Sequence, residues 1–131
     1  MYQAHYDVDA RALLFVDGEK NAGDYLTMGI NVFVCGGLMN PVRMGGLIGR
    51  NAPFAPAIAD GYTHRHVEAS PFMLPDDDPS AALLGVVYLG LSSAEVARVE
   101  TLELDGGYRK QIPLEVRVGD RICPAISYTR A

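Results

Sequence analysis

The chain has 131 residues, of which 49% are hydrophobic and 21% charged, so it is long enough to bury a core without disulfide or metal support. We therefore expect one domain over residues 1–131. The formal net charge of −5 and the lack of a basic patch interleaved with aromatic residues argue against nucleic acid as a partner. No apolar run reaches the roughly 20 residues that span a bilayer, and the N-terminus lacks the pattern of a secretion signal. Membrane association and secretion are thus not expected.

The two cysteines, Cys35 and Cys123, are too few to define a disulfide framework. Whether they pair with each other is left open by the sequence. A reducing cytoplasm is therefore the expected location.

The N-terminal quarter of the chain is the least patterned part. Residues 12–16 form a strand candidate, and the polar, glycine-containing residues 17–23 predict a turn. The β-branched and aromatic run at residues 31–35 predicts a buried strand, which ends at Gly36-Gly37 and feeds a tight loop.

The middle of the chain is rich in glycine and proline. Residues 40–60 predict irregular backbone instead of long regular helices, because Gly45-Gly46, Pro53 and Pro56 interrupt them. Residues 61–67 predict a strand. Residues 70–80, with three prolines and three consecutive aspartates, predict an exposed loop at the border of a pocket.

The C-terminal half shows the clearest elements. Residues 83–91 predict a central strand, and Ser92 with Glu95 forms a capping box that opens a helix ending at residues 105–107. Residues 108–118 and 121–128 predict two strands joined by the two-residue turn Gly119-Asp120. Many strands with one main helix imply an α+β fold, with a curved mixed sheet or a small barrel.

Glu103 is an acid where this helix calls for an apolar residue. Val96, Val99 and Leu102 mark one face, and Glu103 projects between the two valines at about 100° per residue. Loss of hydration raises the pKa of an inward carboxyl toward the range of a general acid or base at neutral pH, which makes Glu103 a candidate catalytic residue. The alternative is that the helix ends near Leu102 and Glu103 meets solvent or a basic partner, Arg109 or Lys110.

Several short motifs occur together in a recognisable order. They are a strand and loop at residues 32–39 (VFVCGGLM), then residues 57–62 (AIADGY), 84–88 (LGVVY) and 99–103 (VETLE), and finally Tyr108-Arg109. In this order they resemble the gamma-glutamylcyclotransferase family, including its AIG2-like branch, over residues 31 to about 129. The first 30 residues match poorly and form an N-terminal extension of unknown role.

The resemblance implies a fold and a reaction. It assigns the catalytic glutamate to Glu103 and a substrate-cradling loop to five residues: Cys35, Gly36, Gly37, Leu38 and Met39. Tyr108 either lines the pocket or only packs its ring. The implied reaction cyclises a gamma-glutamyl amide to 5-oxoproline and releases an amine, with a small-molecule substrate and without metal or organic cofactor. The leaving amine and the oligomeric state stay open.

Two departures from the family motif support an alternative function. Cys35 stands where the family has tyrosine, and Gly37 stands where it has a hydroxyl residue. The chain is then a non-catalytic or repurposed small-molecule-binding domain of the same fold. A third hypothesis is a Cys-His amidohydrolase that pairs Cys35 with His64 or His66. The two histidines share one side of a strand, but without a third ligand in the sequence we assign no metal site.

Overall fold

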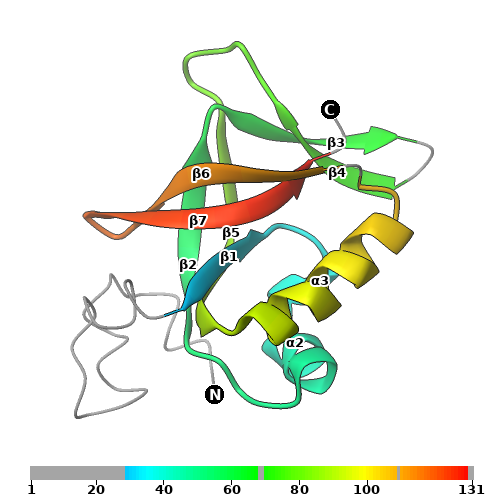
Figure 1. The fold of residues 1–131 in the computed structure, drawn as a ribbon. Helices are drawn as coiled ribbons and strands as arrows, with labels where there is room; N and C mark the ends of the chain where they lie inside the picture. The colour runs from blue at the N-terminus through cyan, green and yellow to red at the C-terminus, as the bar shows by residue number, and fades with distance from the viewer. Residues whose placement is uncertain (1–28, 68–69, 109, 130–131) are drawn as a thin grey trace.

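The computed structural model describes residues 29–67, 70–108 and 110–129. Five of its strands close into a barrel in the order β1-β5-β2-β6-β7, and the other two form a separate ribbon (Figure 1). The strands are β1 (Ile30–Val34), β2 (Phe54–Asp60), β3 (Tyr62–Val67), β4 (Ser70–Pro75), β5 (Ala82–Leu91), β6 (Lys110–Val118) and β7 (Arg121–Thr129). The helices are η3 (Gly37–Met39, a 3-10 turn), α2 (Pro41–Ile48) and α3 (Ser93–Asp105).

The barrel confirms the predicted α+β class. Neighbouring strands of the barrel are antiparallel, with one exception. Strand β1 pairs in parallel with β7, where Val32 lies opposite Ile126, and this pair makes the sheet mixed. The predicted strand at residues 12–16 and the turn after it lie outside the described residues.

Two hydrophobic clusters pack on the two faces of β1. Phe33 points into the barrel, with Val87, Leu89 and Val116 from other strands. Val32 and Val34 point outward, where η3, α2 and α3 cover them. Because both faces are buried, the strand reads as a continuous apolar run instead of an alternating one.

The hairpin of β6 and β7 has the predicted turn. Val118 pairs with Arg121 across Gly119-Asp120, and Gly119 adopts a φ of 61°. Two-residue hairpin turns of the type that matches strand twist need such a positive φ, which glycine adopts without steric cost.

The irregular backbone predicted for residues 40–60 is wrong, because this segment contains α2 and β2. The Asn40 side chain accepts a hydrogen bond from the Val42 amide, Pro41 needs no amide partner at its position, and Gly49 ends the helix at a φ of 85°. The buried side chains of Met44 and Ile48 then anchor a helix with two internal glycines. Packing therefore outweighs the poor helix propensity.

The exposed loop predicted for residues 70–80 is also only partly right. Its first half is β4, which pairs with β3 and buries Met73 completely. Prolines are tolerated there because a two-stranded ribbon leaves one edge of each strand without ladder partners. The second half is a loop, in which the Asp76 and Asp78 side chains accept hydrogen bonds from amides two residues later.

Candidate active site

Glu103 lies on the buried side of α3, as predicted. The helix begins with the Ser92–Glu95 capping box and continues to Asp105, so it does not end at Leu102. Val96 is 8% exposed and Val99 fully buried, whereas Leu102 is 40% exposed. At about 100° per residue, Glu103 points between the two valines and Leu102 lies about 60° beyond Val99. The assignment of Leu102 to the buried face is therefore wrong.

Burial perturbs the Glu103 carboxyl. It raises the pKa of Glu103 from 4.5 to about 7, and this desolvation is the dominant cause. Lys110 lies exposed on β6, and Arg109 lies outside the described residues. A carboxyl group with a pKa near neutrality accepts and returns a proton with little bias, which is the property of a general acid/base.

Tyr108 is held beside Glu103 by the end of the helix. Its amide donates a hydrogen bond of 3.1 Å to the Glu103 carbonyl, and the chain turns at Gly107 with a φ of 111°. The half-buried ring packs against both hydrophobic clusters. Burial first, and then the nearby Cys35 and Glu103, raise the pKa of the Tyr108 hydroxyl. The phenol is therefore neutral at physiological pH and able to donate a hydrogen bond.

Cys35 lies directly after β1, with its sulfur 3.9 Å from the Tyr108 hydroxyl. Burial raises the pKa of the thiol to about 11, the Tyr108 hydrogen bond lowers it, and the Glu103 charge raises it further. Such a thiol holds its proton at neutral pH, which disfavours the Cys-His hypothesis. Cys35 and Cys123 are both free and buried, so the pairing that the sequence left open does not occur.

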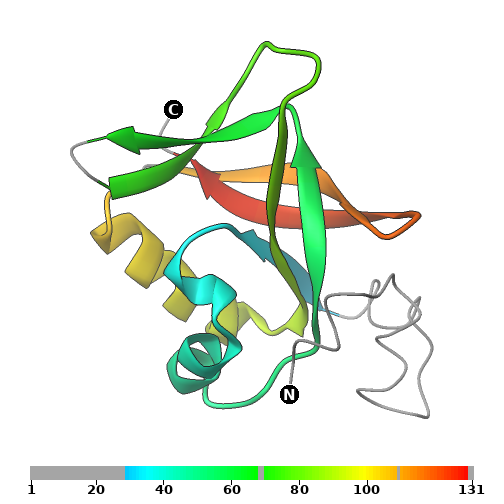
Figure 2. The same cartoon turned by 180° about the vertical axis from the view of Figure 1, so that it is seen from behind.

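The glycine loop lies between β1 and α2 (Figure 2). Leu38 is buried, and its carbonyl accepts a hydrogen bond of 2.7 Å from the Tyr88 hydroxyl on β5. Met39 is partly buried against the helix-covered cluster. A Cβ at Gly36 would meet no atom within 4 Å, so the backbone there faces open space. The buried Leu38 side chain and the hydrogen bond to its carbonyl therefore anchor the loop, while Gly36 stays accessible.

The structure brings Glu103, Cys35 and Tyr108 together and adds a residue that the sequence reasoning missed. Tyr128 on β7 is buried, and the charges of Glu100 and Glu103 contribute to raising the pKa of its hydroxyl, after burial as the main cause. Gln111 donates to Glu100 at 3.1 Å and to the Tyr128 hydroxyl at 3.4 Å. The alternation of β7 toward the core was the available signal for Tyr128.

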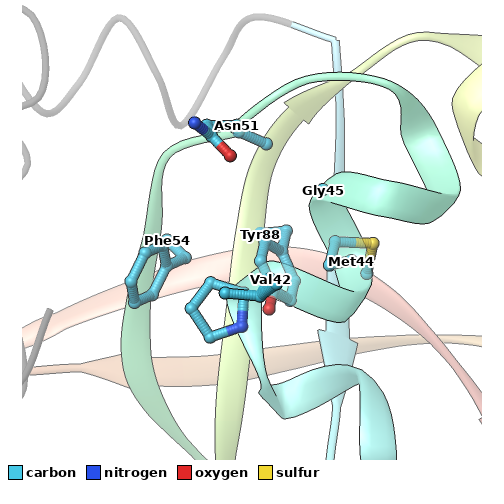
Figure 3. A pocket seen from close by; sticks show the side chains of 8 residues that line it. Val42, Met44, Gly45, Asn51, Phe54 and Tyr88 are labelled. Atoms are coloured by element: carbon cyan, nitrogen blue, oxygen red, sulfur yellow. The ribbon is translucent and has the colours of Figure 1, made fainter.

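A cavity of about 310 Å³ lies elsewhere, between α2 and the start of β2 (Figure 3). It is lined by Pro41, Val42, Met44, Gly45, Asn51, Ala52, Phe54 and Tyr88. Glu103 does not line this cavity. We base the candidate site on the perturbed carboxyl, because no carboxyl, imidazole, amine or thiol group lines the cavity, and these are the usual general acids and bases near neutral pH.

Within residues 29–67, 70–108 and 110–129, no group of three His, Cys, Asp or Glu side chains is arranged to hold a metal ion. In the same ranges, no helix is long and apolar enough to cross a membrane.

The chain belongs to the family described as gamma-glutamyl cyclotransferase, AIG2-like, whose model matches residues 32–130. The fold is similar to that of an Arabidopsis thaliana protein solved in solution, with 26% identity and a TM-score of 0.66 over 76% of this chain and 61% of that one. The chain therefore spans about three-fifths of that protein's length.

More distant structures share the fold alone. A gamma-glutamyl cyclotransferase has 15% identity and a TM-score of 0.62 over 78% of this chain and 66% of that one. A yeast gamma-glutamyl cyclotransferase specific to glutathione has 16% identity and a TM-score of 0.56 over 79% and 69%. No curated protein matches this chain.

Proposed function

We propose that this protein cyclises a gamma-glutamyl amide to 5-oxoproline and releases the amine, with Glu103 as general base and then general acid. The observation that carries the proposal is the half-buried Glu103 carboxyl with its pKa raised to about 7. It lies close enough to Cys35 and Tyr108 for its charge to raise the pKa of both. Family membership supports a small gamma-glutamyl molecule as the substrate.

The pKa of Glu103 suits the first proton transfer. The substrate's α-ammonium must lose a proton before its nitrogen attacks the gamma-carbonyl, and an α-amine has a pKa of about 8. A carboxyl with a pKa near 7 accepts that proton at a cost of about 1.4 kcal/mol. A glutamate at the ordinary value of 4.5 faces a cost of about 5 kcal/mol. Desolvation therefore makes Glu103 a competent base.

The second transfer uses the same group. The nitrogen attack forms the five-membered ring and a tetrahedral oxyanion, and the Glu103 proton then moves to the departing amine as the gamma-amide bond breaks. The ring nitrogen still carries one extra proton after the attack, and the ionised Glu103 carboxylate accepts this proton and passes it to the released amine, which leaves as an ammonium. The loop amide at Gly36 can face the substrate, since a Cβ at this residue would meet no atom within 4 Å. Holding amine and carbonyl together supplies the orientation that an intramolecular attack needs. No step requires a metal or an organic cofactor.

The test compares the wild-type protein with Glu103→Gln on a panel of gamma-glutamyl amino acids and gamma-glutamyl amines, with 5-oxoproline measured by mass spectrometry. We expect release by the wild type and a loss of at least about 100-fold in the variant, the scale of general acid/base catalysis. Glu100→Gln, three residues earlier on α3, controls for the loss of one negative charge. An equal loss in both variants contradicts the assignment of Glu103.

The alternative function, a non-catalytic or repurposed binding domain, is favoured by Cys35 and Gly37 in the loop. It predicts binding of a labelled gamma-glutamyl ligand without turnover of any panel member. The two free, buried thiols are compatible with a reducing compartment, so the cytoplasm is the location that goes with either function.

A further inference from the structure

The guanidinium of Arg43 lies directly over the glycine loop. Its Nη1 atom is 2.5 Å from the position that a Cβ would take at Gly37, and its Cζ atom is 3.2 Å away. A side chain at residue 37 therefore competes with this cation for the same space. The position where the resembling motif has a hydroxyl residue is thus taken by a positive charge in this chain.

Helix α2 directs Arg43 toward the loop. Arg43 is the third residue of α2, after Asn40 caps the helix and Pro41 begins it. Side chains in an α-helix tilt toward its N-terminus, so an arginine in the first turn projects back over the preceding residues. These residues are η3, which Gly37 begins. The placement of the guanidinium follows from the helix geometry.

The Arg43 charge is available to a ligand. Arg50 binds the Glu95 carboxylate and Arg117 binds the Asp60 carboxylate, in each case through two hydrogen bonds. Arg43 makes no such ion pair in the part of the chain that the structure describes, and the first turn of α2 has no acidic residue. A guanidinium beside an accessible loop matches the fork geometry of a carboxylate.

We propose that Arg43 binds the α-carboxylate of the gamma-glutamyl group and thereby positions it over the loop. This inference rests on the proposed function and names the residue that selects its substrate class. Gly37 is two residues from Cys35, so their Cα atoms are at most about 7.6 Å apart. The Cys35 sulfur lies 3.9 Å from the Tyr108 hydroxyl, and the Tyr108 amide donates to the Glu103 carbonyl. These contacts link Arg43 and Glu103 through the loop, and the proposal places the carboxylate of the substrate at the first and its amine at the second.

The contact between Gly37 and Arg43 allows the position of the guanidinium to be changed without removing its charge. Gly37→Ala retains the cation but displaces it from the loop, since the clashing atoms are the end of a flexible side chain. Arg43→Gln removes the charge with similar length, and Arg43→Lys keeps the charge without the fork. Arg121→Gln, exposed beside the Gly119-Asp120 turn, controls for the change in net charge.

The experiment measures amine release from a gamma-glutamyl ethylamide and from its α-carboxamide analogue, with the four variants and the wild type. We expect Arg43→Gln to raise KM for the carboxylate substrate about 10- to 100-fold, the scale of a charge-assisted hydrogen-bonded pair, while kcat changes little. Arg43→Lys and Gly37→Ala should show intermediate increases. The α-carboxamide should be a poor substrate whose KM is the same for wild type and Arg43→Gln.

Three outcomes overturn the inference. The first is an unchanged KM in Arg43→Gln, and the second is an equal change in Arg121→Gln. The third comes from repeating the comparison with a gamma-glutamyl amino acid: a loss with that substrate but not with the ethylamide shows that the carboxylate bound is that of the leaving group. Binding of 5-oxoproline and of its amide, followed by calorimetry, separates this failure from that of the proposed function. Carboxylate binding that depends on Arg43, without turnover, supports the inference and contradicts the enzyme, whereas the absence of both rejects the two proposals together.

Discussion

Replacing Glu103 by glutamine should stabilise the folded protein at alkaline pH. The pKa of Glu103 is raised from 4.5 to about 7 by burial, so the folded state holds a proton that the unfolded state has released. Wild-type stability relative to the variant is therefore greatest below pH 4.5 and falls as the pH rises through about 7. Glutamine mimics the protonated acid at every pH, so the relative stability of Glu103→Gln rises over the same window.

The size of the effect follows from the same values. The difference between 4.5 and about 7 corresponds to at most about 3.4 kcal/mol, because one pKa unit is worth about 1.36 kcal/mol. The carboxyl is only partly buried, and solvent screening reduces this figure to about 2 kcal/mol. We expect near-equal stabilities at pH 4 and a gain of about 2 kcal/mol in the variant at pH 8.5.

Urea denaturation of both proteins at intervals between pH 4 and pH 8.5 measures this difference. Subtracting the two curves removes the titration of groups that the proteins share, and Glu100→Gln reports the contribution of a net-charge change. A difference that stays flat across the range refutes the desolvation argument, and so does a wild type that gains stability relative to the variant as pH rises. Either result also removes the main support for Glu103 as an acid/base.

Three further predictions follow from the packing. Gly85→Ala should lower the free energy of unfolding by about 3 kcal/mol or more, since a Cβ there would lie 2.6 Å from the buried Phe33 ring of β1. Gly46→Ala on α2 is the control, because its Cβ meets no atom within 4 Å, and it should be neutral or stabilising by up to about 1 kcal/mol. Thermal denaturation measures both variants, and equal effects contradict the close contact between β1 and β5. Tyr88→Phe should lower the free energy of unfolding by about 1–2 kcal/mol and raise KM several-fold, because the Leu38 carbonyl in the loop loses its hydrogen bond. Unchanged kinetics would show that the loop does not bind the substrate. Cys35 should resist alkylation by iodoacetamide at pH 8, because a thiol with a pKa of about 11 is then only about one part in a thousand thiolate. Activity should therefore survive the treatment. Rapid inactivation would instead favour the Cys-His amidohydrolase hypothesis.

Local signals in the sequence were enough for the elements with strong boundaries. The capping box at Ser92 and the turn at Gly119-Asp120 involve residues within three positions of each other, so their geometry is encoded locally. The same holds for the inward direction of Glu103, which follows from helix periodicity and two buried valines. The family resemblance over the later part of the chain agrees with the matched range of residues 32–130.

Elements whose stability comes from distant partners were mispredicted. Helix α2 has two internal glycines, and it forms because Met44 and Ile48 are buried beneath it. Strands β2 and β4 contain prolines, and each is held by pairing with a strand that is adjacent in space. Leu102 was placed in the core because the sequence does not show where the barrel surface ends.

The sequence by itself determined that this chain is an α+β member of its family and that one inward glutamate interrupts the apolar face of its main helix, since both follow from motif order and helical period. Only the tertiary structure decided what surrounds that glutamate. Burial of the inner face of α3 depends on side chains from β1, β5 and β7 that pack with Val96 and Val99 after the barrel closes, and the approach of Arg43 to Gly37 depends on how α2 packs. Electrostatic environment is a property of three-dimensional burial, which no linear pattern contains.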